Sequence, residues 1–156
     1  MRSSFFRLLA IFAACFATPW TLWHQRKIRK RGRDLNTQEL VAAEALGLTH
    51  PESICIAVVQ RVPNPLYPLL CLARSCGASC ITEAAGITLG RGIYVAEESK
   101  ESLELIAHEL VHVRQYHEAG SIWAFMVEYL YQCLMVGYYD AEWEKQARYE
   151  SARVLG

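Results

Sequence analysis

The hydrophobic positions of the chain form an apolar amino-terminal stretch followed by shorter segments with the periods of strands and helices. Residues 54–59, and the residues on either side of the turn Gly90-Arg-Gly92, are rich in β-branched and apolar side chains, which predicts three short strands. Four segments have helical patterns: 39–46, 105–116, 122–136 and 141–153. The order of these elements predicts an α+β domain in which a small, mostly antiparallel sheet is followed by a helical core.

Residues that start and stop helices support these boundaries. The segment Asn36-Thr-Gln-Glu39 has the spacing of a capping box. Ser99 and Ser102 are both candidate N-caps for the helix that contains residues 105–116, and Gly120 is placed to end it. Asp140 is the expected cap of the last helix. We expect residues 122–136, which are apolar nearly all round, to be a buried helix that packs behind residues 105–116, with a membrane-dipping helix as the alternative.

The amino-terminal stretch, residues 1–23, is apolar apart from Arg2 and Arg7. It is short for a helix that crosses a bilayer, but Trp20 and Trp23 lie at its end, just before the basic run, where an interfacial aromatic belt is expected. We therefore predict a single-pass membrane anchor. A cleaved signal peptide and an interfacial or buried helix remain the alternatives.

Basic residues are concentrated directly after this stretch. Six of the sixteen Lys and Arg residues lie within residues 26–33, so residues 24–35 are predicted to be a basic juxtamembrane linker that attracts anionic lipids. The positive-inside rule then places the remaining domain, residues 36–156, in the cytoplasm, with an exported domain as the alternative. No second basic patch accompanies the run, so nucleic-acid binding is not expected.

The candidate chemistry lies in the motif His108-Glu-Leu-Val-His112, an H-E-x-x-H sequence. On a helix the two histidines, four residues apart, share one face and can bind one metal ion. Glu109 lies about 100° around the helix from His108, where it can reach a metal-bound water but cannot act as a third ligand. We expect Zn²⁺ as the metal and Glu109 as the general base of a hydrolase.

A catalytic zinc site needs a third protein ligand. The third histidine of the metzincin pattern is absent, and His117 falls on the far side of the helix from the pair. We expect Glu144 to be the ligand, because the small Ala147 one turn later would let the last helix approach closely. The other candidates are all glutamates: Glu118, Glu128, Glu142 and Glu150.

Three stretches of this chain carry a resemblance to a known family: residues 108–116, 86–95 and 139–147. Over residues 36–153 the chain resembles bacterial metallopeptidase-like proteins related to the extracellular contractile injection system core domain. In that family a late helix carries Pro-Phe-Glu-x-x-Ala; Glu144 and Ala147 match its Glu and Ala, whereas Glu142-Trp143 replaces Pro-Phe. The resemblance implies a zincin-like, gluzincin-type fold and hydrolase activity, and identifies no substrate.

The cysteines form a second cluster, Cys71, Cys76 and Cys80, whose spacing fits no regular zinc finger. Reduced thiols there would suit a cytoplasmic domain. A disulfide between Cys80 and either of the other two would suit an exported one.

These patterns together predict a membrane-anchored zinc metallopeptidase that acts on a peptide or protein substrate. An extended peptide can add to an edge of the predicted sheet, and a hairpin that only covers the core is the alternative. Four side chains are candidates to assist the reaction: Tyr116, Tyr138, Tyr139 and Arg148. The alternatives are a non-catalytic metal-binding or interaction module, and a membrane-associated scaffold in which the motif is accidental.

Overall fold

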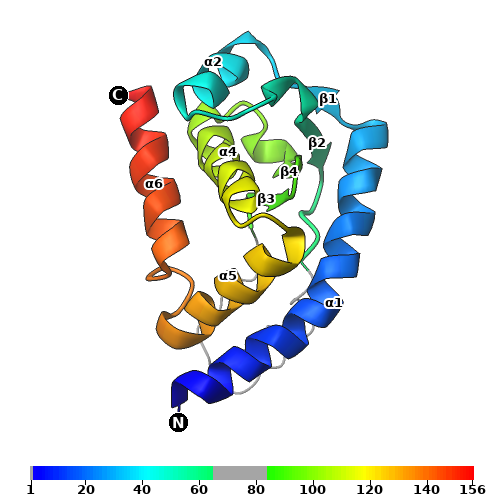
Figure 1. Ribbon diagram of the computed structural model, residues 1–156. Coiled ribbons are helices and arrows are strands. Elements are labelled where there is room, and N and C mark those ends of the chain that lie inside the picture. The colour runs from blue at the N-terminus through cyan, green and yellow to red at the C-terminus, as the bar shows by residue number, and fades with distance from the viewer. Residues whose placement is uncertain (1, 65–83) are drawn as a thin grey trace.

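The computed structural model describes residues 2–64 and 84–156. Within them, helices surround one small sheet, so the predicted α+β architecture is confirmed (Figure 1). The elements are α1 (Arg2–Arg31), β1 (Arg33–Asp34), α2 (Thr37–Ala45), a 3₁₀ turn at Pro51–Ser53, β2 (Cys55–Val59), β3 (Gly86–Leu89), β4 (Gly92–Ala96), a 3₁₀ turn at Glu97–Ser99, α4 (Leu103–Glu118), α5 (Ile122–Val136) and α6 (Glu142–Leu155). The cysteine cluster at 71–80 lies outside the described residues.

The sheet is mixed, with strand order β1-β2-β4-β3. The predicted hairpin of β3 and β4 is antiparallel, as is the pairing of β1 with β2. However, the central pair runs parallel, with Cys55 opposite Gly92 and Val59 opposite Ala96, so the expectation of a mostly antiparallel sheet describes only the outer pairings. Strand β3 makes the return that parallel strands require, because it begins at the end of the sheet where β2 stops and runs antiparallel to β4, with Gly86 opposite Val95.

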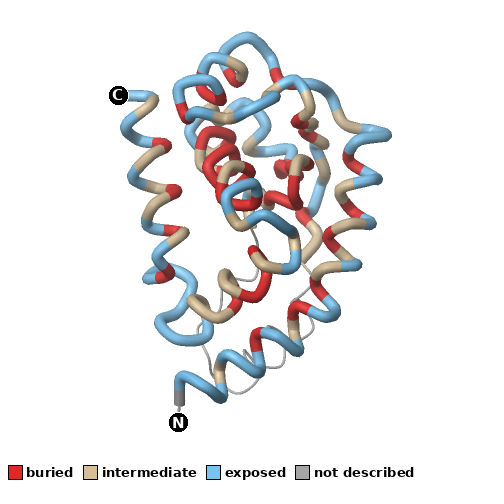
Figure 2. Tube along the Cα trace, viewed as in Figure 1, coloured by how far each residue is buried: buried red, intermediate tan, exposed pale blue. Residues whose placement is uncertain are grey.

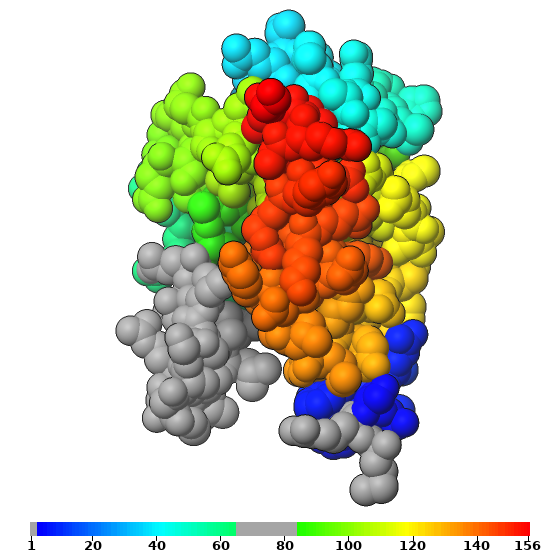
Figure 3. All heavy atoms as spheres, turned by 90° about the vertical axis from the view of Figure 1, so that its left-hand side faces the viewer, coloured from blue at the N-terminus to red at the C-terminus, as the bar shows by residue number. Residues whose placement is uncertain are grey.

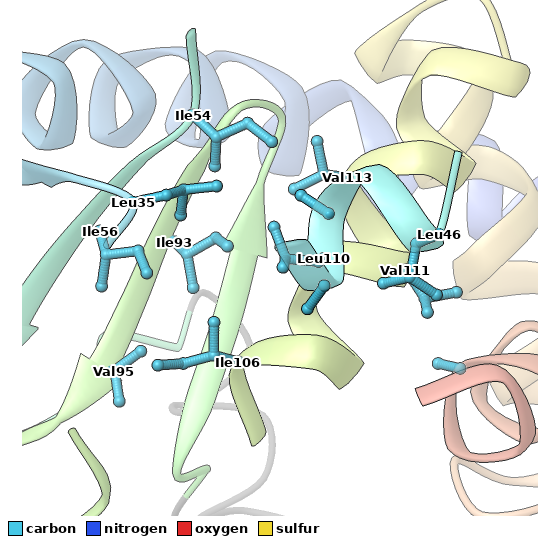
Figure 4. Close-up of a cluster of buried hydrophobic side chains, with 13 residues drawn as sticks. Leu35, Leu46, Ile54, Ile56, Ile93, Val95, Ile106, Leu110, Val111 and Val113 are labelled. Atoms are coloured by element: carbon cyan, nitrogen blue, oxygen red, sulfur yellow. The ribbon is translucent and has the colours of Figure 1, made fainter. Parts of the chain in front are cut away.

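The main core lies between one face of this sheet and α4. Figure 4 shows Ile56 and Ile93 of the sheet facing Ile106 and Leu110 of the helix. All four side chains are almost completely buried. Ile106 and Leu110 come two residues before His108 and His112, which is about 200° around a helix, so the core lies on the face of α4 opposite the two histidines.

Helix α1 continues through the basic run to Arg31, so residues 24–31, predicted to be linker, are helical. Its carboxyl-terminal half packs on the sheet through His24 and Ile28, which are buried one turn apart. A Cβ atom at Gly92 would lie 2.8 Å from Ile28 Cδ1, so this approach requires glycine. Lys and Arg are good helix formers, which is why a run of charge did not mark the end of the helix.

The amino-terminal half of α1 packs along α5 (Figure 1). The contact is made through Ala10, Ala14 and Ala17, which meet Phe125 and Leu130. Most of the packing of α5 is against α1 rather than behind α4, which corrects the predicted position of this helix. Helix α1 is long and apolar enough to cross a membrane by composition.

The helix caps agree with the sequence in two cases out of three. Asn36 and Glu39 form the predicted capping box, and Ser102 caps α4 by accepting a hydrogen bond from the amide of Leu105. The expected cap of α6 by Asp140 is wrong: the N-cap residue is Ala141, and Asp140 instead forms an ion pair with Lys145, with its Oδ1 3.3 Å from Nζ.

Ile28→Ala should destabilise the domain, because Ile28 is completely buried between α1 and the sheet. The lost packing is expected to cost about 2–5 kcal/mol, seen as a lower midpoint in thermal unfolding. Ile11→Ala on the same helix is the control, since Ile11 is 37% exposed. Equal losses in the two variants would contradict the docking of α1 described here.

Candidate metal centre

The two histidines of the motif lie on one face of α4, as predicted. Their Nε2 atoms are 3.1 Å apart. The rings meet edge to face, with centroids separated by 4.8 Å. Both imidazoles therefore point one nitrogen at the same place.

Glu144 of α6 joins the histidines from the neighbouring helix. Its Oε2 lies 3.3 Å from His108 Nε2 and its Oε1 lies 3.3 Å from His112 Nε2, and its side chain is 1% exposed. Ala147 is fully buried in the core beside α4. Helix α6 therefore approaches α4 closely at this small residue, as the sequence predicted.

The spacing of these donor atoms suits a tetrahedral ion. Zinc bonds to nitrogen and oxygen are about 2.0–2.1 Å long, and two ligands of a tetrahedral ion then lie about 3.3–3.4 Å apart. The two Nε2 atoms lie 3.1 Å apart, and each has a different oxygen of Glu144 at 3.3 Å, so each of these separations is close to the edge length. With one ligand atom taken from each residue, the three atoms lie within 4.8 Å of one another. The three residues form a group that can hold a metal ion.

Gln115 sets the tautomer of His112. The Gln115 amide nitrogen donates to the carbonyl oxygen of Trp143 and to Gln146 Oε1, both at 3.0 Å, so its oxygen must face His112. That oxygen lies 2.8 Å from His112 Nδ1 and accepts its proton. The Nε2 atom of His112 is thus left with a lone pair directed at His108 and Glu144, which is the form that binds a metal.

The Glu144 carboxylate is held in its charged form. Burial raises its pKa, but the interactions with His108 and His112 and the hydrogen bond from Tyr129 outweigh burial and lower the pKa well below its usual range. The Tyr129 hydroxyl donates to Oε1 at 2.6 Å. The buried Oε2 has no hydrogen bond of good geometry with any described residue. An anion in this position favours a cation beside it.

Burial lowers the pKa of His112, whereas the hydrogen bond and charge of Glu144 raise it by more. The result is a raised pKa, which shows how strongly this position attracts positive charge. A bound metal ion would supply the same charge without a proton.

Glu109 is buried beside the centre, against strand β3. Thr88 Oγ1 lies 2.6 Å from Glu109 Oε2, and it also lies 2.9 Å from the main-chain oxygen of Glu109. A Cβ atom at Gly86 would come within 2.8 Å of Glu109 Oε1, so β3 can approach only because residue 86 is glycine. Burial raises the pKa of Glu109, while the nearby charges of His112 and His108 oppose the rise.

The other candidate ligands lie elsewhere. Glu118 and Glu150 both pair with Arg114. Glu128 pairs with Arg7 of α1, and Glu142 and His117 are exposed.

The structure also places the side chains considered as assistants. Tyr116 is buried in a stack with Phe125 and faces the core, with ring centroids 3.6 Å apart. Burial and the nearby charge of Glu144 raise the pKa of Tyr138, and Arg148 Nη1 lies 3.9 Å from Glu144 Oε2. Tyr139 is exposed, with Arg148 over its ring. Tyr138 and Arg148 are therefore the two at the centre.

Three residues of the site were not anticipated from the sequence: Thr88, Gln115 and Tyr129. The position of Gln115, three residues after His112, is a helical spacing that places it beside that ring. Thr88 and Tyr129 come from β3 and α5, and no local pattern marks them, because only the packing of these elements brings them to α4.

Comparison with known proteins gives one match. The family model described as the eCIS core domain matches residues 71–120. In the described part, this segment contains β3, β4 and α4, and it therefore includes the histidine pair and Glu109 but ends before Glu144. No curated protein and no solved structure matches the chain.

Glu144→Ala should lower the affinity for zinc and the thermal stability together, because it removes one donor and leaves two histidines facing an empty position. Zinc content after dialysis and the unfolding midpoint measure the two effects. Glu142→Ala, on the same helix but exposed, is the control and should change neither. Retention of zinc by the Glu144 variant and its loss from the Glu142 variant would show that α6 is rotated.

Gln115→Ala should weaken zinc binding about ten- to a hundredfold, since outer hydrogen-bond partners of metal ligands have effects of this size. The change frees His112 to rotate and to place a proton on Nε2. Gln146→Ala serves as the comparison, because it removes an acceptor for Gln115 without touching His112. Competition with a chromophoric chelator gives both affinities, and equal values would contradict the orienting role of Gln115.

Proposed function

We propose that this protein is a membrane-associated zinc peptidase of gluzincin-like type, in which His108, His112 and Glu144 hold Zn²⁺. The observation that carries the proposal is the convergence of His108, His112 and Glu144, which each offer one ligand atom within 4.8 Å of the other two, with Glu109 buried next to them. Two histidines and a glutamate are the ligands of one established class of zinc hydrolase, which leaves a position for water.

When bound, Zn²⁺ would lower the pKa of its water to about 7 and polarise the carbonyl of a peptide. Glu109 would accept the proton of the attacking water and pass it to the leaving amine. The raised pKa of Glu109 suits this task, because a base is most effective when its pKa is near the working pH. Thr88 holds one oxygen of the carboxylate in place through its hydroxyl.

The sheet offers a place for an extended peptide. Among the described strands, β3 is at the end of the sheet and has a partner on one side only. It also carries Thr88 next to Glu109, so a peptide paired with its open side would run beside the metal. We propose that the substrate binds along the open side of β3.

We propose that α1 holds the protein on a membrane. Its composition allows a bilayer contact, and the basic residues 26–33 follow its aromatic residues Trp20 and Trp23. The same residues favour anionic lipids as partners and the cytoplasmic side for the domain.

A non-catalytic module of the same fold is the second possible function. It would keep all three ligands, so metal binding does not separate it from a peptidase. The role of Glu109 separates the two functions.

Glu109→Gln should keep zinc and abolish hydrolysis, because the amide preserves the shape of the side chain but cannot accept the proton. The rate of peptide hydrolysis should fall by about 10²-fold or more. A quenched fluorescent peptide library, tested with wild type and variant at equal zinc content, measures the difference.

His117→Ala is the control for the library, since this histidine is exposed and away from the ligands. It should leave hydrolysis unchanged. If zinc-loaded wild type cleaves no more peptide than Glu109→Gln, the non-catalytic module is correct. If the Glu109 variant also loses zinc, Glu109 is a ligand rather than a base.

A further inference from the structure

Two segments far apart in the sequence expose large apolar side chains. The first is the amino-terminal half of α1, with Phe5, Leu8, Phe12 and Phe16. The second is the end of α5 and its connection to α6, with Leu134, Met135, Val136, Tyr138 and Tyr139. Figure 3 shows the connection directly above the amino-terminal end of α1, at one end of the molecule. Together they are called the apolar end below.

Helix α5 and the amino-terminal half of α1 form one antiparallel unit. At its end Ser3 Oγ lies 2.7 Å from the Tyr131 hydroxyl, and Arg7 Nη1 lies 3.1 Å from Glu128 Oε2. Between these contacts and the sheet, small alanines of α1 let the two backbones approach closely. Figure 2 shows the buried residues of this half of α1 on the side toward α5 and the exposed ones away from it. The two helices therefore enter any membrane together.

This unit is not built to cross a bilayer. The 15 residues of α5 extend about 22 Å, less than the hydrocarbon thickness of about 30 Å. The next residues include the charged Asp140, Glu142 and Lys145, and α6 must return to α4 with Glu144. The pair Arg7–Glu128 adds two charges, which are costly at a bilayer centre and acceptable at its surface. If α1 spanned with α5 attached, these charges would enter the hydrocarbon.

The composition of α1 identifies a lipid surface as the partner of the apolar end. Trp20 and Trp23 lie on α1 after the exposed phenylalanines, and Trp23 is exposed. They are followed by Arg26, Lys27, Arg29 and Lys30, which complement anionic headgroups. Exposed Phe, Leu and Trp side chains together with Lys and Arg on the same helix are typical of a helix that lies in the lipid interface.

We propose that the amino-terminal half of α1 and the α5–α6 connection lie in one leaflet of an anionic bilayer, with both ends of the chain on the same side of the membrane. The protein is then monotopic, which differs from the single-pass anchor expected from the sequence. This inference rests on the membrane association of α1 proposed above, and it does not depend on hydrolysis.

Helix α5 connects this surface to the candidate metal centre. The last residues of α5 belong to the apolar end, and the hydroxyl of its Tyr129 donates to Glu144 Oε1 at 2.6 Å. A leaflet that contains the connection therefore brings the candidate ligands to its surface. The substrates suited to such a centre are polypeptide segments that lie at or leave the bilayer surface.

Topology is tested on the full chain with one epitope tag at each terminus, expressed in bacteria. In sealed inverted membrane vesicles, added protease should remove both tags or neither, because both termini share one side. Removal of only one tag would show that α1 crosses the membrane and would overturn the proposal. Release of the chain from the vesicles into the supernatant would overturn it as well.

Lipid contact of the connection is tested with a photoreactive amino acid at Val136, and at Val41 of α2 as the matched control. The two valines are 54% and 60% exposed. In vesicles of phosphatidylglycerol and phosphatidylcholine, position 136 should cross-link to lipid several-fold more than position 41. Equal lipid yields would overturn the proposal, and cross-links from position 136 to a second copy of the chain would show a dimer interface in its place. Both tests measure where the chain lies relative to the membrane and do not measure peptide hydrolysis. An inactive protein could therefore pass them, and an active peptidase could fail them.

Discussion

The burial of the Glu144 carboxylate is the constraint on which the arrangement of the helices depends. A carboxylate removed from water needs compensating charge and hydrogen bonds, because an unpaired buried ion is very costly. Here two imidazoles from α4 and a hydroxyl from α5 meet it. The three helices can satisfy Glu144 only in one relative position, so the metal centre and the packing of the helical part require each other.

The same constraint reaches beyond the helices. Gln115 connects His112 to the main chain of α6, and Thr88 connects Glu109 to β3. The hydrogen bonds of Gln115 join α4 to α6 and orient the candidate ligand His112. The hydrogen bond of Thr88 joins α4 to β3 and orients the candidate base Glu109. Preorganisation of this kind is what a hydrolytic metal site requires, since misplaced groups lose most of their effect.

The amino-terminal helix takes part in this arrangement and is not a separable anchor. Its carboxyl-terminal half packs on the sheet through Ile28, while its amino-terminal half packs on α5. Because α5 also supplies Tyr129 to Glu144, a change in how α1 meets a membrane has a continuous route of packed residues to the metal centre. The proposed seating in one leaflet would use this route to hold the centre at the lipid surface.

Local patterns were enough to predict the histidine pair, the position of Glu109 beside it, the β3–β4 hairpin and the caps at Asn36 and Ser102, because spacing along a helix or turn determines which side chains meet. The match of Glu144 to the histidines was also anticipated, but four other glutamates fitted the local pattern nearly as well. Only tertiary packing decided among them, since each of the other four glutamates is either paired with a distant arginine or exposed. The parallel pairing of β2 with β4, the course of α1 over the sheet, and the contributions of Thr88 and Tyr129 likewise depend on contacts between residues far apart in the chain, which no period of two or 3.6 residues encodes.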